Sequence, residues 1–208
     1  MHSTVESSSA TPARPARAGY RMEELRTGDA GREQLEAFVA CRFADVHKAR
    51  VHSFMPALLG MHDAQGALRC ALGYRDASAN TLYLEQYLDV PVERAIADAL
   101  MASGEPASRI ERGSVVEVGN LAGRGCRAAL HMVARLPRYL IARGYQWVTF
   151  TATSRVRSVL DSFDAPLIDL GPADPARLRG DTDEWGEYYR CAPRVMAGFL
   201  PHGLQFSR

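Results

Sequence analysis

One stretch, SVVEVGNLAGRGCRAALHMVARLPRYLIARGYQWVTFTAT at residues 114–153, limits what this chain can fold into more than any other. It begins with a valine-rich run, breaks at two glycines, continues with apolar residues spaced along one face of a helix, and ends in a β-branched run. A strand, turn, helix and strand in this order form a crossover connection, whose two strands lie parallel in one sheet. Glu117 lies in the first strand, just before the glycines.

The flanking segments predict further strands and helices. Residues 20–25 alternate like a short strand, residues 31–50 carry apolar residues three and four apart as in an amphipathic helix, and residues 57–78 form two apolar runs around the turn DAQG. Residues 81–103 begin as an extended segment and continue as a helix after Pro91. The remaining elements are a helix at 153–164, a short strand at 165–171 and a last strand within 188–200.

This order of elements predicts the α/β class, with a mixed, mostly antiparallel central sheet and helices on both faces. Residues 1–19 are rich in Ser, Ala and Pro and are typical of a disordered tail. We therefore expect residues 20–208 to form a single domain.

Composition argues against several classes of function. The net charge is +1, which gives no attraction to nucleic acid. The four cysteines lie far apart without a CxxC motif or a histidine pair, so neither a zinc site nor a disulfide framework is indicated. No segment reaches the roughly 18 consecutive apolar residues of a membrane helix. We expect a cytoplasmic protein with no metal, no nucleic-acid partner and no membrane span.

The glycine turn NLAGRGCRA is the first candidate site. A helix that starts directly after a strand leaves backbone N–H groups unpaired, and glycines allow a ligand to approach them. The helix dipole adds partial positive charge, which favours an anion such as the phosphate of coenzyme A or phosphopantetheine. A tight turn that binds nothing explains the same glycines. The candidate donor-binding residues are Leu121, Ala122, Gly123, Arg124, Gly125, Cys126, Arg127 and Ala128.

Glu117 is the candidate general base. Its neighbours Val115, Val116 and Val118 predict apolar surroundings. Such surroundings raise the pKa of a carboxyl group and suit it to take a proton from an attacking amine. The alternative is a structural carboxylate paired with Arg75 or another arginine.

The segment LEQYLD is a candidate acceptor site. On an extended strand, Glu85, Tyr87 and Asp89 share one face, with Gln86 on the other. Two carboxylates and a phenol on one face are suited to hold a cationic amine. An exposed edge strand explains the same polar residues.

Aromatic residues near the end of the chain are candidates for a proton donor. Tyr188, with Trp185 and Tyr189 close in sequence, can supply a phenol to protonate a departing thiolate. A buried aromatic cluster is the alternative.

The chain resembles known families at two levels. Residues 114–153 resemble the acyl-CoA pyrophosphate motif of the GCN5-related N-acetyltransferase fold, in which a central strand carries a carboxylate and the next helix opens with a Gly/Arg turn. The phrases FMPALLGM, GYRDA, LYLEQYLDVPVE, VVEVGNLAG, WVTFTAT, WGEYY and PRVMAGFL resemble, in this order, the thermostable hemolysin family over residues 37–200. Sequences of that family look like the same acyltransferase fold, with kinship to acyl-homoserine-lactone synthases.

The resemblance implies roles at a few positions. Glu117 matches the carboxylate of the synthases' Glu-x-x-Arg motif, and Asn120 stands where that motif has its arginine. Arg75 matches the arginine that ends their preceding hairpin strand, so it is a candidate for substrate binding. Arg42 is a looser match to an arginine near their S-adenosylmethionine pocket. Independently of the resemblance, Thr151 alternates with apolar residues on its strand, so we expect it to line the gap between the two central strands; ordinary use of threonine in a strand is the alternative.

The resulting hypothesis is an N-acyltransferase in secondary metabolism. It predicts transfer of an acyl group from an acyl-CoA or acyl-carrier-protein thioester to a small amine, with no tightly bound cofactor. The alternatives are a membrane-active hemolysin-type protein and a non-catalytic acyl-CoA-binding domain. A carrier-protein donor requires a basic docking surface. The candidates for it are Arg124, Arg127, Arg135, Arg138 and Arg143.

Overall fold

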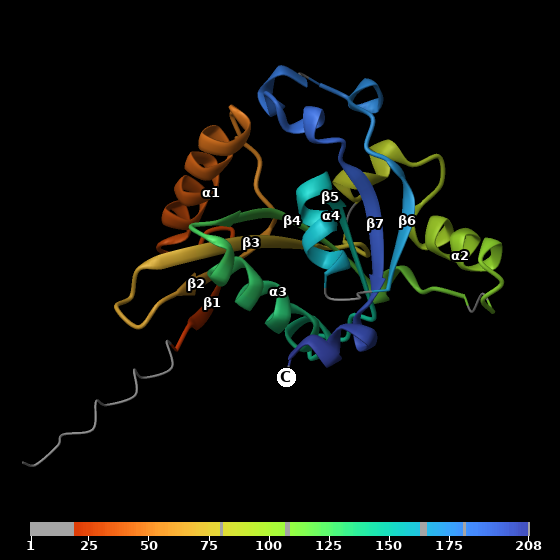
Figure 1. Cartoon of the computed structure of the whole chain (residues 1–208), viewed down its shortest axis with the longest axis horizontal. Coiled ribbons are helices and arrows are strands. Elements are labelled where there is room, and N and C mark those ends of the chain that lie inside the picture. The colour runs from red at the N-terminus through yellow and green to blue at the C-terminus, as the bar shows by residue number, and fades with distance from the viewer. Residues whose placement is uncertain (1–18, 80, 107–108, 163–165, 181, 208) are drawn as a thin grey trace, which may run out of the picture.

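The computed structural model describes residues 19–79, 81–106, 109–162, 166–180 and 182–207. Seven strands form one sheet in the order β1-β2-β3-β4-β5-β7-β6 (Figure 1). The strands are β1 (Arg21–Arg26), β2 (Ala57–His62), β3 (Leu68–Asp76), β4 (Val115–Gly123), β5 (Trp147–Ala152), β6 (Leu167–Pro172) and β7 (Arg194–Phe199). Neighbouring strands are antiparallel except β4 and β5, which are parallel, as the crossover predicted.

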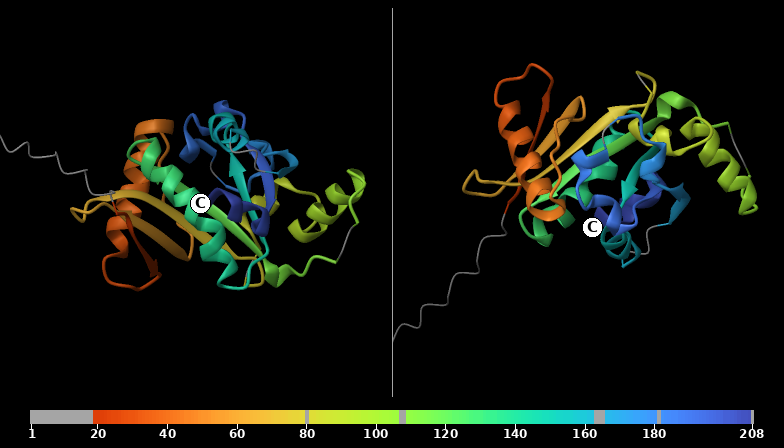
Figure 2. Two further views of the ribbon diagram at one scale, coloured as in Figure 1. Left: turned by 60° about the horizontal axis from the view of Figure 1, so that its bottom comes forward. Right: turned by 90° about the horizontal axis from the view of Figure 1, so that it is seen from above.

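Helices cover both faces of the sheet. They are α1 (Arg32–His47), α2 (Val92–Ala102), α3 (Cys126–Ile141) and α4 (Ser154–Asp161). In Figure 1, α1 and α3 lie on opposite sides of β3 and β4, and the views of Figure 2 place α1 and α2 at opposite ends of the sheet. The predicted α/β class, with a mixed and mostly antiparallel sheet covered on both faces, is confirmed.

Strand alternation divides the core into an α1 face and an α3 face. On the α1 face, Leu35 and Val39 of α1 pack with Leu58 of β2. On the α3 face, Met132 and Leu136 of α3 belong to a cluster with strand residues that include Leu59, Leu72 and Val118. Alternate residues of a strand project to opposite faces, so Glu117 points to the α1 face between two valines that point to the α3 face.

The two central strands separate part-way along their length. β4 and β5 pair only where Val115–Val118 faces Trp147–Phe150, and beyond that point they run apart (Figure 1). A β-bulge marks the separation, because Ala122 pairs with Ala71 but Gly119 pairs with Gly73, which leaves two residues of β4 opposite one residue of β3. Such a bulge bends its strand, and here it opens a gap in the middle of the sheet.

The structure corrects the sequence interpretation of residues 81–90. The expected extended segment is wrong, because Tyr83–Tyr87 forms a 3₁₀ helix, η1. The Glu85 carboxylate accepts hydrogen bonds from the N–H groups of Leu82 (2.8 Å) and Val92 (2.9 Å), which closes the turn. Leu82 and Leu84 are both buried, and their spacing of two residues imitates the alternation of a strand.

The end of the chain also differs in detail from its prediction. The last strand was expected within residues 188–200, but the 3₁₀ helix η5 (Tyr188–Cys191) precedes β7. The other short helices are η2 (Arg112–Ser114), η3 (Pro175–Arg177), η4 (Thr182–Trp185) and η6 (Leu200–Ser207). The predicted tail falls outside the described residues except for residue 19.

Two features of the described ranges concern membranes and metals. No helix within them combines the length and apolarity needed to cross a bilayer. No three His, Cys, Asp or Glu side chains in the same ranges gather as metal ligands do.

The four cysteines are unpaired thiols, and burial raises the pKa of the Cys70 thiol to about 12.

The position of Glu85 yields a stability prediction. Its side chain is 9% exposed and pairs with Arg112 at 2.7 Å. Glu85→Gln should lower the free energy of unfolding by about 1–3 kcal/mol, because a largely buried charge pair loses one partner. Urea denaturation measures the change. Asp98→Asn, in an exposed pair with Arg94 on α2, should change it by less than about 0.5 kcal/mol. Equal effects of the two substitutions would show that the Glu85 pair is no more stabilising than a surface pair.

Candidate active site

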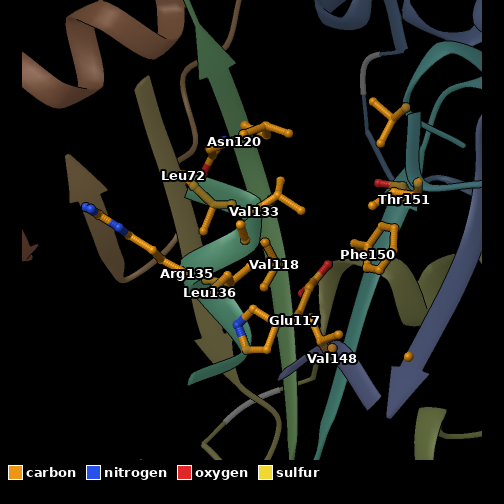
Figure 3. Close-up of a pocket in the computed structure, with 18 of the residues that line it drawn as sticks. Leu72, Glu117, Val118, Asn120, Val133, Arg135, Leu136, Val148, Phe150 and Thr151 are labelled. Atoms are coloured by element: carbon orange, nitrogen blue, oxygen red, sulfur yellow. The ribbon is translucent and has the colours of Figure 1, made fainter. Parts of the chain in front are cut away.

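A cavity of about 1040 Å³ crosses the sheet where β4 and β5 separate. Figure 3 shows Glu117 between these strands, with Val133 and Leu136 of α3 on one side and Val148 and Phe150 of β5 on the other. The lining on the α1 face is aromatic or apolar and comes from Phe43, His47, Met55, Trp185 and Tyr188. One carboxylate therefore lies in the middle of a mostly apolar channel.

Backbone N–H groups hold the Glu117 carboxylate. The side chain is buried, and it accepts hydrogen bonds from the N–H groups of Tyr83 (2.8 Å) and Leu84 (3.0 Å) in η1. Burial raises the pKa of Glu117, although the two N–H groups and the charge of Arg75 act in the opposite direction. The expected rise in pKa is confirmed. Glu117 forms no ion pair with any residue that the structure describes, so the alternative of an arginine pair is not realised there.

Asn120 fixes the bulge. Its backbone has φ 52°, in the left-handed region, and its Oδ1 accepts a hydrogen bond from the N–H of Met55 at 2.8 Å. The Met55 side chain fills the hollow over two glycines, because a Cβ at Gly73 would lie 2.5 Å from Met55 Cβ and one at Gly119 would lie 2.6 Å from Met55 Cε. Asn120 lines the cavity, and its side chain ties the segment before β2 to the point where the strands separate.

The glycine turn opens α3 without a side-chain cap. β4 extends to Gly123, so Leu121 and Ala122 lie on the strand, and Gly125, with φ 86°, precedes the helix that begins at Cys126. The N-cap residue is Gly125, which supplies no side-chain cap, so the first-turn N–H groups are available to an anion. The cavity reaches this region at Leu121 and Arg127.

The arginines near the turn differ in their surroundings. The backbone N–H of Arg124 donates a hydrogen bond to the backbone carbonyl of Arg69 at 2.8 Å. The guanidinium of Arg124 lies 5.7 Å from the centre of the Phe38 ring. Arg42 Nε donates to the Gly123 carbonyl at 3.2 Å. Arg42 therefore braces the end of β4 from α1.

Tyr188 and Thr151 meet at the cavity. Tyr188 is buried, burial raises the pKa of its phenol, and a hydrogen bond with Thr151 acts in the opposite direction. Its ring lies 5.4 Å from the Trp185 ring, and both residues line the cavity. The tyrosine therefore keeps its proton at neutral pH. Tyr188 and Trp185 belong both to the aromatic cluster and to the cavity wall, whereas Tyr189 belongs to the cluster but not to the described lining.

The predicted acceptor face is not assembled. Glu85 is bound to Arg112, the side-chain oxygen of Gln86 accepts from the Arg179 N–H at 3.0 Å, and the Tyr87 hydroxyl lies 2.7 Å from that of Tyr189. Asp89 pairs with Arg177 at 2.5 Å. None of these four predicted residues belongs to the described lining of the cavity. Burial raises the pKa of Glu85, but hydrogen bonds from Arg112 and two backbone N–H groups outweigh it, so the pKa is lowered overall.

The sequence profile described as Thermostable hemolysin matches residues 25–204. This chain belongs to the thermostable hemolysin family. No curated protein matches it significantly.

Solved structures share the fold of this family member. The acyl-homoserine-lactone synthase LasI has a TM-score of 0.56 at 12% identity, covering 88% of this chain and 91% of its own. TofI in an apo form has a TM-score of 0.57 at 11% identity, covering 90% and 95%. FeeM, an N-acyl amino acid synthase from uncultured soil microbes, has a TM-score of 0.53 at 11% identity, covering 89% and 93%. At such identities the likeness establishes the fold alone.

Sequence reasoning missed one wall of the site in this thermostable hemolysin family member. Phe43 and His47, at the end of α1, line the cavity beside Trp185. The carbonyl of His47 accepts the Glu187 N–H at 2.6 Å, and the Arg50 N–H donates to the Glu184 carbonyl at 2.6 Å. These contacts join segments more than a hundred residues apart, so no local pattern could have indicated them.

The strained backbone at Asn120 gives a prediction for this family member. Asn120→Ala should lower the free energy of unfolding by about 2–3 kcal/mol, because alanine is costly in the left-handed region and the bond to Met55 is lost. Asn120→Gly should cost less, because glycine accepts a positive φ. Denaturant unfolding of both variants separates strain from hydrogen bonding. A glycine variant no more stable than the alanine variant would show that strain is not the larger part.

Proposed function

We propose that this protein is an N-acyltransferase that moves an acyl group from a coenzyme A or acyl-carrier-protein thioester to a small amine. One observation carries the proposal: a mostly apolar cavity crosses the sheet between β4 and β5 and has a buried carboxylate, Glu117, at its centre. A channel of this kind suits a long, uncharged thioester arm, and a carboxylate with a raised pKa suits proton abstraction. LasI, an acyl-homoserine-lactone synthase, and FeeM, an N-acyl amino acid synthase, share this fold and support the same reaction class.

The donor arm would lie in the gap between β4 and β5. Past Val118 and Phe150 the facing edges of the two strands no longer pair with each other, so their backbone groups can bind the amides of a pantetheine arm as an added strand does. The phosphate would lie at the turn from Gly123 to Ala128, where first-turn N–H groups and Arg127 favour an anion.

Transfer would proceed by direct attack. The amine nitrogen bonds to the thioester carbon, the C–S bond breaks, and Glu117 in its ionised form takes the proton that the amine loses. Tyr188, whose phenol keeps its proton at neutral pH, donates a proton to the departing thiolate. Solvent then removes the proton from Glu117 and restores that of Tyr188.

The acyl chain would occupy the α3 face of the cavity. Val133, Leu136, Val148 and Phe150 form an apolar chamber there, beside Gly198 of β7. The apolar side chains that line this chamber favour an acyl chain of several carbons over an acetyl group.

A carrier protein is a possible donor in addition to coenzyme A. Arg127, Arg135 and Arg138 belong to α3 and line the cavity, and carrier proteins present acidic surfaces to their partners. Arg143 is less free, because it pairs with Glu24 at 2.6 Å. Parallel assays with the same acyl group on coenzyme A and on carrier protein distinguish the two donors.

Replacing Glu117 tests the proposal. Glu117→Gln should lower kcat by about 10²–10⁴, the range expected when a general base is lost. Thiol release from an acyl-CoA measures turnover. Glutamine has only one acceptor oxygen for the N–H groups of Tyr83 and Leu84, so the thermal midpoint of the variant should also fall. As a control, calorimetric binding of the acyl-CoA shows whether the donor site is intact. Unchanged turnover would contradict the role of Glu117, and a protein that binds donor without any turnover would be a binding domain.

The pH dependence of kcat/KM is a second test of the role of Glu117. Burial raises the pKa of Glu117 above its ordinary 4.5, and the base works only when ionised. In the wild type, kcat/KM should therefore rise as pH increases through the raised pKa. In Glu117→Gln this rise should disappear, and the remaining increase of kcat/KM with pH should follow only the loss of the proton from the acceptor amine.

Chain length is tested at Gly198. A Cβ added there would lie 3.0 Å from Leu167 Cδ2 and 3.5 Å from Val148 Cγ1, at the edge of the chamber. Each buried methylene group should raise kcat/KM about fourfold, so Gly198→Leu should shift the preferred donor to shorter chains and Gly198→Ala should do so less. A series of acyl-CoA donors from acetyl to dodecanoyl measures the shift. An unaltered preference in Gly198→Leu would place the acyl chain elsewhere.

A further inference from the structure

Arg75, the candidate for substrate binding on β3, has no role in the transfer steps proposed above. It lies near the end of β3, opposite Glu117 in the antiparallel register with β4. Opposite residues of such a pair project to the same face, so the guanidinium lies on the α1 face, and its charge acts against the rise in the Glu117 pKa. Arg75 is half-buried and is not among the described residues that line the cavity. Its side chain takes part in no hydrogen bond or ion pair within the part of the chain that the structure describes. The guanidinium of Arg75 presents several N–H donors in one plane, an arrangement suited to binding a carboxylate.

The acidic residues around this face do not favour a cationic acceptor. Glu85 and Asp89 are neutralised by Arg112 and Arg177. Glu117 is the only Asp or Glu in the described lining of the cavity. A second positive charge on the acceptor would therefore have no counter-charge other than the base itself.

The remaining wall on this face is uncharged. Phe43, His47, Trp185 and Tyr188 line it, and the His47 and Tyr188 rings lie 5.2 Å apart. Burial lowers the pKa of His47, so its imidazole is neutral at neutral pH. Such a wall suits an apolar or aromatic substituent.

We propose that the acceptor is an α-amino acid with an apolar or aromatic side chain. Arg75 binds its carboxylate, Glu117 receives the proton from its amine, and the aromatic wall contacts its side chain. In an α-amino acid the carboxylate and the amine share one carbon, and directly opposite residues on paired strands, about 5 Å apart, can reach two groups so closely linked. The inference rests on the proposed acyl transfer and names the acceptor for the same site.

Three related acceptors test the inference. Phenylalanine, phenylalanine amide and phenethylamine share the ring and the amine but carry a carboxylate, a neutral amide or neither. With octanoyl-CoA as donor, the wild type should prefer phenylalanine over the amide by about 10- to 100-fold in kcat/KM. Arg75→Gln should abolish this preference by raising the KM for phenylalanine, with the KM for phenethylamine within about twofold of the wild-type value. Arg75→Lys should retain part of the preference because it keeps the charge.

The control is Arg94→Gln, an exposed arginine of α2 paired with Asp98, which should leave all three acceptors unaffected. If Arg75→Gln lowers kcat equally for all three and shifts the pH profile, Arg75 only tunes Glu117 and the inference is wrong. If the wild type uses phenethylamine as well as phenylalanine, the acceptor inference fails while acyl transfer stands.

A lack of transfer with every donor and acceptor would instead contradict the proposed function. In that case the carboxylate site is tested by binding alone. Phenylalanine is added to the protein and the change in tryptophan fluorescence is measured. Binding to the wild type that Arg75→Gln abolishes would support the site. Absence of binding to the wild type, or equal binding of phenylalanine and phenethylamine, would overturn it.

Discussion

The left-handed backbone at Asn120 is the constraint on which the rest of the site depends. It places an extra residue in β4, and the resulting bulge turns this strand away from β5 while β5 continues along β7. The hydrogen bond to the Met55 N–H and the two glycines beneath the Met55 side chain hold the bulge in place. A bulge of this kind bends its strand, and the pairing of β4 with β5 ends at Val118 and Phe150, just before it.

Glu117 couples the chemistry of the site to the architecture around it. Its two oxygens accept the N–H groups that begin η1, so the same carboxylate that would act as base also anchors the segment leading to α2. Burial without an ionic partner would be costly for a charged group, and the N–H groups offset part of that cost. Any substitution at this position therefore changes both stability and the proton-accepting group.

The sequence predicted the features that depend on local patterns. The crossover from β4 to β5 followed from the valine run, the glycines and the spacing of apolar residues on α3, and the raised pKa of Glu117 followed from its valine neighbours. The acidic acceptor face was wrong for a physical reason: Glu85 and Asp89 are paired with Arg112 and Arg177, which lie far along the chain. Such partners, like the contact of α1 with residues 184–187, are set by tertiary packing and leave no local signal.

The passage of the cavity through the sheet has a consequence for the order of events. Its walls on the two faces come from different elements, α3 on one side and α1 with the 182–191 segment on the other, so donor and acceptor would approach the reacting carbon from opposite directions. Cys126 is exposed and is not among the described lining residues, which leaves it poorly placed to carry the acyl group between them. Both substrates would then have to be bound at once, and transfer would occur within a ternary complex rather than through a covalent acyl-enzyme.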